Sequence, residues 1–309
     1  MKRACAIAML VTAIAQSAFG QAPFVVEQLS LGGIHSWRIR WDRSDEFNKE
    51  SVDWQKWQKK PEKFGGWDWD NTRNACIEDG VLTLTVQSSS VDASKKPGRK
   101  SPRNRFSAAM LKSYRTGCYG YYEARIKGAA LFPGVCPAFW LYSRIDDALL
   151  EEGAVRYSEI DVVELTQRNN FISGNERITD HNLHVILSNG QPGVAGRQWL
   201  RPGNDLYRAG QANEYSAPFD PRDDFHVYGC EVTVEKIAWY VDGLKIGEKQ
   251  NSYWHRDMHV ALSVGLRPPY VTWTARGLVY AEGQPHEGFP AAMQVDYVRV
   301  WDRVESANN

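Results

Sequence analysis

Residues 236–246 read KIAWYVDGLKI and carry the clearest fold signal in the chain. Two runs rich in apolar, β-branched and aromatic side chains, Lys236–Val241 and Leu244–Ile246, flank the dipeptide Asp242–Gly243. Asp-Gly accepts the positive φ angles of a type I′ turn, whose twist matches that of two antiparallel strands. The stretch therefore predicts a tight β-hairpin.

Further strands are predicted on both sides of this hairpin. Residues 81–86 are rich in β-branched side chains after the turn signal Asp79–Gly80, and residues 119–127 alternate with a period of two. Residues 258–264 and 294–301 also have strand character, whereas residues 146–152 favour at most one short helical turn. Many short strands without helices between them predict an all-β fold of two packed antiparallel sheets, a β-sandwich or jelly roll.

The first 20 residues have the pattern of a secretory signal peptide. Lys2 and Arg3 precede an apolar run over residues 4–15, and the small residues of Ala18–Gly20 supply a cleavage site near Gly20–Gln21. The run is shorter than the roughly 20 residues that cross a bilayer, and no later segment is apolar enough to cross one. We expect a secreted protein, extracellular or periplasmic, in which residues 21–309 form a single domain.

Charge and cysteine content narrow the function classes. The chain has 37 basic and 37 acidic residues, and proteins whose main task is nucleic-acid binding usually carry a basic excess. A local basic site for an anionic ligand remains compatible with this balance. After signal removal four cysteines remain (Cys76, Cys118, Cys136 and Cys230); they lack the paired spacing of a zinc site, and whether they form a disulfide stays open.

Acidic side chains alternate with apolar ones over residues 157–165, YSEIDVVEL. Glu159 and Asp161 are two residues apart, so they share one face of a strand, whereas Glu164 would point to the opposite face. A β-bulge at Val162–Val163 would absorb one residue and return Glu164 to the face of the other two acids. We therefore predict a bulged strand with all three carboxylates on one side.

Such a cluster is poor for stability, because neighbouring carboxylates raise one another's proton affinity. Glycoside cleavage needs this arrangement, since one carboxylate attacks in its ionised form while another donates a proton to the leaving oxygen. A solvated acidic edge strand and a calcium site are the alternatives. The Ile and Val residues between the acids favour a strand backed by core, and hence catalysis.

The motif Glu159–Glu164 resembles the bulged signature of glycoside hydrolase family 16, and the surrounding blocks resemble its κ-carrageenase branch. The resemblance extends from about residue 43 to residue 299, through these blocks: Tyr119–Gly128, Phe132–Val135, Pro137–Trp140, Tyr157–Gln167, Pro218–Arg222, Tyr253–Arg256 and Gly265–Arg267. Residues 88–105, which we interpret as a basic loop, residues 272–285 and three of the cysteines depart from the branch.

The resemblance implies a single catalytic jelly-roll domain with a cleft or tunnel across its concave sheet. It implies that Glu159 is the nucleophile, Asp161 its partner and Glu164 the general acid/base of a retaining, endo-acting enzyme. The implied substrate is κ-carrageenan, a sulfated galactan, cut at β-1,4 linkages. Furcellaran, β-carrageenan or an agar-type galactan is the alternative substrate. A galactan-binding module without catalysis and a lyase are the alternative functions.

The resemblance also implies substrate-binding residues. Arg fits a sulfate because its planar fork donates two parallel hydrogen bonds, and sugar faces stack on aromatic rings. The expected sulfate ligands are Arg201 and Arg267, the expected stacking platforms are Trp140, Trp199 and either Trp67 or Trp69, and the expected sugar-contacting histidine is His184. His181, His226 and His255 are expected to be structural. We expect a monomer that needs no cofactor; relatives sometimes bind a structural calcium, but the sequence has no dedicated ligand loop.

Overall fold

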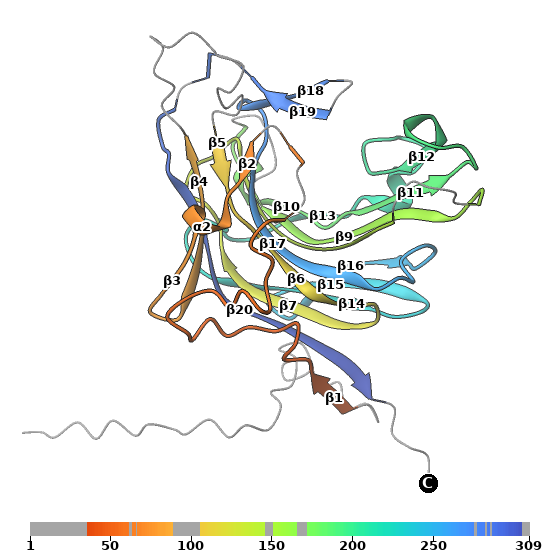
Figure 1. Ribbon diagram of the computed structural model, residues 1–309, viewed down its shortest axis with the longest axis horizontal. Helices are drawn as coiled ribbons and strands as arrows, with labels where there is room; N and C mark the ends of the chain where they lie inside the picture. The colour runs from red at the N-terminus through yellow and green to blue at the C-terminus, as the bar shows by residue number, and fades with distance from the viewer. Residues whose placement is uncertain are drawn as a thin grey trace, which may run out of the picture.

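The computed structural model describes residues 36–61, 64–65, 67–88, 106–145, 151–165, 172–274, 277–281, 283–284 and 286–304. Two large, curved sheets lie one over the other (Figure 1). The predicted all-β sandwich is therefore confirmed. The signal peptide, most of the basic loop of residues 88–105 and most of the turn expected at residues 146–152 lie outside the described residues, and so do residues 275, 276, 282 and 285 of the segment 272–285.

The larger sheet has ten strands, and its path order is β16-β15-β14-β7-β20-β4-β5-β2, with β1 beside β20 and β3 beside β4. Its strands are β16 (Leu244–Gln250), β15 (Lys236–Val241), β14 (His226–Val232), β7 (Gly120–Lys127), β20 (Ala291–Val304), β4 (Val81–Ser88), β5 (Phe106–Ala108), β2 (Asp68–Trp69), β1 (Ser36–Ile39) and β3 (Ala75–Glu78).

The smaller sheet has eight strands in the order β12-β11-β9-β8-β17-β6, with β10 joining β9 to β13. Its strands are β12 (Arg197–Leu200), β11 (Leu183–Ser188), β9 (Val155–Leu165), β8 (Val135–Arg144), β17 (Met258–Leu266), β6 (Met110–Gly117), β10 (Ile178–Asp180) and β13 (Glu214–Ser216). A separate hairpin is formed by β18 (Val271–Thr274) and β19 (Gly277–Tyr280). Among the described residues the helical elements are single turns: α2 (Asn71–Asn74), α3 (Arg208–Gln211), η1 (Asn175–Arg177) and η2 (Val194–Gly196).

The hairpin predicted around Asp242–Gly243 is present in the structure. Strands β15 and β16 pair antiparallel on either side of Asp242 and Gly243, whose φ angles are +47° and +79°. The side chain of Asp242 also accepts a hydrogen bond from the Val227 amide (2.8 Å) and lies 2.7 Å from His226 Nδ1. The turn is therefore tied to the neighbouring strand β14.

The main core lies between the two sheets. Alternate residues of β4 (Leu82, Leu84 and Val86) are fully buried and share one cluster with Ile160 and Val162 of β9. Burying an apolar side chain of this size contributes about 1.5–3 kcal/mol. The apolar residues between the acids of β9 therefore anchor that strand to the core, as the sequence predicted.

The four cysteines are free thiols: Cys76 is exposed, Cys118 is half-buried, and Cys136 and Cys230 are buried. The disulfide that the sequence left open does not form among them. No helix in the described part of the chain is long and apolar enough to span a membrane.

Candidate active site

Strand β9 contains a bulge at Val162. Against β8, Asp161 pairs with Trp140 and Val163 with Phe139, so Val162 has no counterpart. The bulge was predicted at Val162–Val163, and this register confirms it.

The bulge brings the three acids to one face. Glu164, Asp161 and Glu159 lie opposite residues 138, 140 and 142 of β8, which alternate along one face of that strand. Without the extra residue, Glu164 would point into the core. The sheet therefore presents a row of three carboxylates.

Two buried indole rings donate hydrogen bonds to backbone carbonyls of strand β9. Trp239 Nε1 donates to the carbonyl of Asp161 (2.9 Å), and Trp254 Nε1 donates to the carbonyls of Glu159 (2.8 Å) and His184 (3.2 Å). Both rings are at most 1% exposed. These contacts fix the backbone on which the acids stand.

The middle acid, Asp161, is the most deeply buried of the three. It is 3% exposed, and burial, reinforced by the charges of Glu159 and Glu164, raises its pKa well above the ordinary value. A neutral Asp161 can donate a hydrogen bond that a carboxylate cannot. Burial and the Glu159 charge also raise the pKa of Tyr157 well above its ordinary value, and the Tyr157 hydroxyl donates a hydrogen bond to Glu159 Oε2.

His184 lies beside Glu159 and Asp161, because it pairs with Glu159 across β11 and β9 and so shares its face of the sheet. Its Nε2 lies 3.3 Å from Asp161 Oδ2 and 3.7 Å from Glu159 Oε1. Burial opposes a charge on the ring, but the charge of Glu159 and the hydrogen bond to Asp161 outweigh it and raise the pKa of His184 to about 9. The imidazole is therefore a cation at neutral pH.

Glu159, Asp161 and His184 also form a group that could hold a metal ion, since one ligand atom of each lies within 4.8 Å of the others. Calcium prefers six to eight oxygen ligands, which this set does not offer. A transition metal suits the imidazole better but would have to displace its proton. The set fits a proton-bridged catalytic cluster better than a metal centre.

One carboxylate oxygen of Glu164, Oε1, contacts both Arg267 and Cys136. Arg267 Nη2 lies 2.5 Å from Glu164 Oε1, and the buried thiol of Cys136 lies 3.7 Å from the same atom. Asp180 of β10 pairs in register with Glu164, so its side chain lies on the same face. The predicted sulfate ligand Arg267 therefore lies in the carboxylate cluster and contacts the candidate acid/base directly.

The aromatic residues differ in how much of their surface they offer. Trp140 stands opposite Asp161 but is only 8% exposed, because it stacks on Tyr142 at 4.5 Å between ring centroids. Trp69 is half-buried and packs against Trp67. Trp67 itself is 4% exposed within the main core, so Trp69 is the one of these two candidate platforms that offers more ring surface to a sugar.

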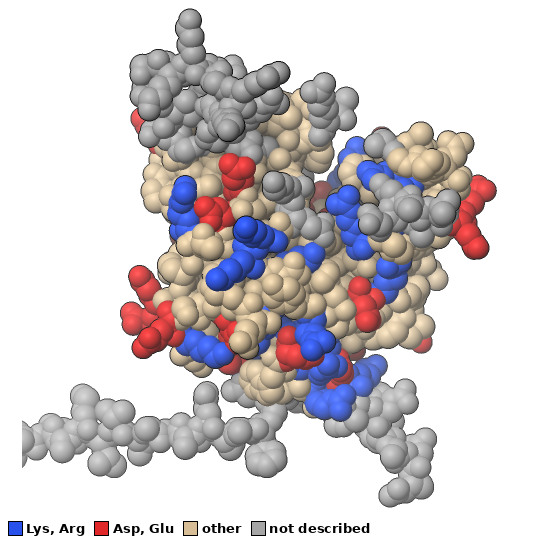
Figure 2. Space-filling view, in the orientation of Figure 1, with Lys and Arg blue, Asp and Glu red and all other residues tan. Residues whose placement is uncertain are grey.

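Trp199 and Arg201 lie at the edge of the smaller sheet. Trp199 pairs with Ile186, which in turn pairs with Tyr157, so Trp199 is on the catalytic face; its ring is 43% exposed. The Arg201 guanidinium lies 4.8 Å from the Trp199 ring centroid. Figure 2 shows basic side chains on the part of the molecule where Figure 1 places β12. The two residues are placed to contact an anionic sugar.

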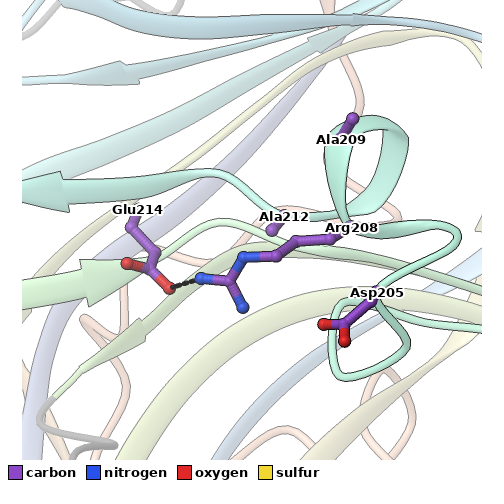
Figure 3. Close-up of a pocket in the computed structure, with 5 residues that line it drawn as sticks. All are labelled: Asp205, Arg208, Ala209, Ala212 and Glu214. Atoms are coloured by element: carbon purple, nitrogen blue, oxygen red, sulfur yellow. Dashed lines mark hydrogen bonds and ion pairs between the residues drawn. The ribbon is translucent and has the colours of Figure 1, made fainter.

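A shallow pocket lies farther along the sheet (Figure 3). Its wall includes Glu214 of β13, which pairs with Asp180 two strands away from the bulge, and Arg208, whose Nη2 is 3.1 Å from Glu214 Oε1. Arg208 and Glu214 therefore form an ion pair at the surface. The pocket holds none of the three candidate catalytic acids.

Sequence reasoning missed Tyr157, Cys136 and Asp180. Tyr157 precedes Glu159 by two residues, and Cys136 precedes Ala138 by two, so the period of a strand could have placed both on the catalytic face. Asp180 reaches this face through the pairing of β10 with β9, for which the sequence carries no local signal.

Comparison with known proteins shows extended similarity. A family model described as Beta-porphyranase A-D, GH16 domain, matches residues 37–303. The κ-carrageenase of Pseudoalteromonas carrageenovora is 44% identical over 307 residues, which cover 97% of this chain and 72% of that protein. The solved structure of that κ-carrageenase in complex with an oligotetrasaccharide of κ-carrageenan has a TM-score of 0.76 at 45% identity, covering 87% of this chain and 96% of the other. A κ-carrageenase structure from Zobellia galactanivorans gives the same TM-score of 0.76 and the same coverage, 87% and 96%, at 39% identity.

Proposed function

The chain belongs to glycoside hydrolase family 16 and has its jelly-roll fold, and from that membership we propose that it cleaves κ-carrageenan within the chain, at β-1,4 linkages and with retention of configuration. The relatives named κ-carrageenase, one of them solved with a κ-carrageenan oligosaccharide, support the substrate. The observation that carries the proposal is the bulge at Val162, which puts Glu159, Asp161 and Glu164 on one face.

In the proposed reaction Glu159 attacks the anomeric carbon while Glu164 donates its proton to the departing oxygen. A covalent glycosyl-enzyme forms, and water then enters the leaving-group site. Glu164 takes a proton from this water, the water oxygen attacks the anomeric carbon, and Glu159 leaves as a carboxylate. Two inversions restore the β configuration, and they require carboxyl groups only about 5–5.5 Å apart.

Asp161 and His184 serve the nucleophile in this scheme. The raised pKa of Asp161 favours a proton on it that can be donated to Glu159. His184, a cation within 3.7 Å of Glu159 Oε1, offsets the charge that two acids place in one buried site. Together they allow Glu159 to be ionised beside a second carboxyl group.

Sulfate recognition is assigned first to Arg201. It is exposed, and its guanidinium lies over the Trp199 ring, an arrangement that leaves the N–H edge available to an oxyanion. Arg267 is paired with Glu164, so its contact with a sulfate would also change the surroundings of the acid/base. Trp199 is the favoured stacking platform.

A β-porphyranase activity is the second candidate, because the matching family model carries that description. Furcellaran, β-carrageenan and agar-type galactans remain alternatives for the cleft. Product sizing on purified κ-carrageenan, furcellaran, ι-carrageenan, porphyran and agarose separates these functions. We expect the fastest release of reducing ends from κ-carrageenan, and turnover of porphyran but not of κ-carrageenan would reverse the assignment.

The same assay separates the remaining alternatives. A lyase would create an unsaturated product that absorbs in the ultraviolet, whereas hydrolysis yields reducing ends without such absorbance. A binding module would bind galactan without releasing reducing ends, and Glu164→Gln would leave the amount of reducing ends unchanged. We expect Glu164→Gln to abolish most turnover while the variant still binds the polysaccharide.

We further propose that residues 1–20 direct secretion and that no metal is required. N-terminal sequencing of the secreted protein should give a sequence that begins near Gln21; retention in the cytoplasm with Met1 intact would refute the signal. Activity should survive a chelator such as EDTA, and its loss with recovery on adding calcium would instead indicate a structural ion.

A further inference from the structure

Strand β9 changes neighbours at its bulge. Glu164 and Leu165 pair with β10, whereas Ile160 and the residues before it pair with β11. Between these stretches, the three residues Asp161–Val163 lie opposite two, His181 and Asn182, which join β10 to β11. A bulged residue is left out of the ladder, so its backbone groups need another partner.

His181 supplies the partner for the carbonyl of Val162. Its Nδ1 lies 2.6 Å from Val162 O, its Nε2 lies 2.8 Å from Thr179 Oγ1, and its backbone amide donates to Asn213 O (2.8 Å). A carbonyl only accepts, so Nδ1 carries the proton and Nε2 accepts from the Thr179 hydroxyl. The side chain is fully buried, and burial lowers the pKa of His181 to about 4, so the ring is neutral and keeps this tautomer.

We propose that His181 is a positioning residue for the reaction: by holding the Val162 carbonyl it keeps the bulge in the register that turns Glu164 toward Glu159. The inference rests on the function proposed above for these two acids. A slip of one residue moves a side chain to the other face of a sheet. His181 itself is fully buried, and its ring acts on the acids through the Val162 carbonyl.

Two substitutions form a matched pair. The amide nitrogen of Asn occupies the place of Nδ1, so His181→Asn keeps a donor for Val162 O. The longer His181→Gln places its amide near Nε2 and loses that donor. Because a misplacement of about 1 Å costs roughly a hundredfold in rate, we expect His181→Gln to lower kcat on κ-carrageenan about a hundredfold with KM nearly unchanged. His181→Asn should stay within about tenfold of the wild type, although it leaves the larger cavity.

An activated substrate separates positioning from stability. A κ-carrageenan oligosaccharide with a 2,4-dinitrophenyl aglycone releases dinitrophenolate, which takes the bond electrons and needs no proton from Glu164. Added azide then attacks the glycosyl-enzyme without a general base, forms the glycosyl azide and frees the Glu159 carboxylate. The kcat deficit of His181→Gln should therefore shrink to within about tenfold on this substrate. A variant that is only less folded would lose both activities in the same proportion.

His226→Gln is the matched control, because the His226 ring also lies close to a hydrogen-bonding side chain, but it belongs to β14 and its partner Asp242 lies in the β15–β16 turn, not at the bulge. Its kcat should equal that of the wild type. Thr179→Val keeps His181 but removes the hydroxyl partner of Nε2, and it should show a smaller deficit of the same kind; it also tests the inference if a His181 variant does not fold. Equal losses in His181→Asn and His181→Gln, or an undiminished deficit on the activated substrate, would overturn the inference. Wild-type turnover of κ-carrageenan in the same assay shows separately whether the proposed function holds.

Discussion

Raising the pH through 9 should destabilise the folded protein through one imidazole, that of His184. The ring sits between Glu159 and Asp161, and their influence outweighs burial and raises the pKa of His184 from 6.5 to about 9. A histidine whose pKa is higher in the folded state stabilises the fold through its proton. This contribution is fully present below the unfolded pKa of 6.5 and is lost as the pH rises through about 9.

The size of the effect follows from the two pKa values. The difference between 6.5 and about 9, at about 1.36 kcal/mol per pH unit, gives on the order of 3 kcal/mol. Protons on Asp161 and His184 are linked, which spreads the loss over a wider pH range and lowers the part that belongs to His184 alone. We therefore expect a loss of roughly 1–3 kcal/mol in the free energy of unfolding.

Urea unfolding of the wild type and of His184→Gln over this pH range measures the loss. The wild type should be the more stable protein below pH 6.5, and its advantage should fall as the pH rises from there through about 9. In NMR spectra, one histidine resonance that is missing from the variant should titrate near that pH. If the two proteins lose stability in parallel with pH, or if that resonance titrates near 6.5, the ionic pairing of His184 with the acids is wrong.

Further tests address the acids, the bulge, the arginines and the thiols. Glu159→Gln and Glu164→Gln should each lower kcat on κ-carrageenan by about a hundredfold or more, and azide should restore turnover of an activated substrate to a Glu164→Ala variant but not to Glu159→Gln. Deleting Val162 should abolish turnover while Val162→Ala retains it; an active deletion variant would disprove the role of the bulge. Arg201→Ala should weaken binding of sulfated galactan more than of desulfated galactan, as judged by KM, whereas Arg267→Ala should lower kcat on both because it also removes the ion pair between Arg267 and Glu164. A reducing agent should leave the melting temperature unchanged, because the four cysteines are free thiols; a marked drop would indicate a disulfide.

The bulge was predictable because it resolves a conflict within nine residues. The acids had to share a face for chemistry, the apolar residues had to reach the core, and the spacing of Asp161 and Glu164 allowed both only with one extra residue. The hairpin at Asp242–Gly243 was predictable for a similar reason, since the turn residues and the flanking strands agree. In both cases, residues within one short segment are enough to predict the local backbone structure.

Contacts between distant segments were less predictable. The sequence left open whether Trp67 or Trp69 is a stacking platform; strand β2 is only two residues long, and Trp67, which precedes it, is buried in the core. Arg267 was expected to meet sulfate, yet the end of β17 places it against Glu164, a separation of 103 residues in sequence. His181 was expected to be structural, and its partner in the structure is a backbone carbonyl, which no sequence pattern marks.

The configuration of the first products tests the central claim most directly. Proton NMR during the hydrolysis of κ-carrageenan records which anomer appears before mutarotation. If Glu159 attacks and Glu164 exchanges protons on the same face of the bulged strand, the β-anomer must form first. Initial release of the α-anomer would mean inversion, and it would contradict the roles assigned here to the two acids.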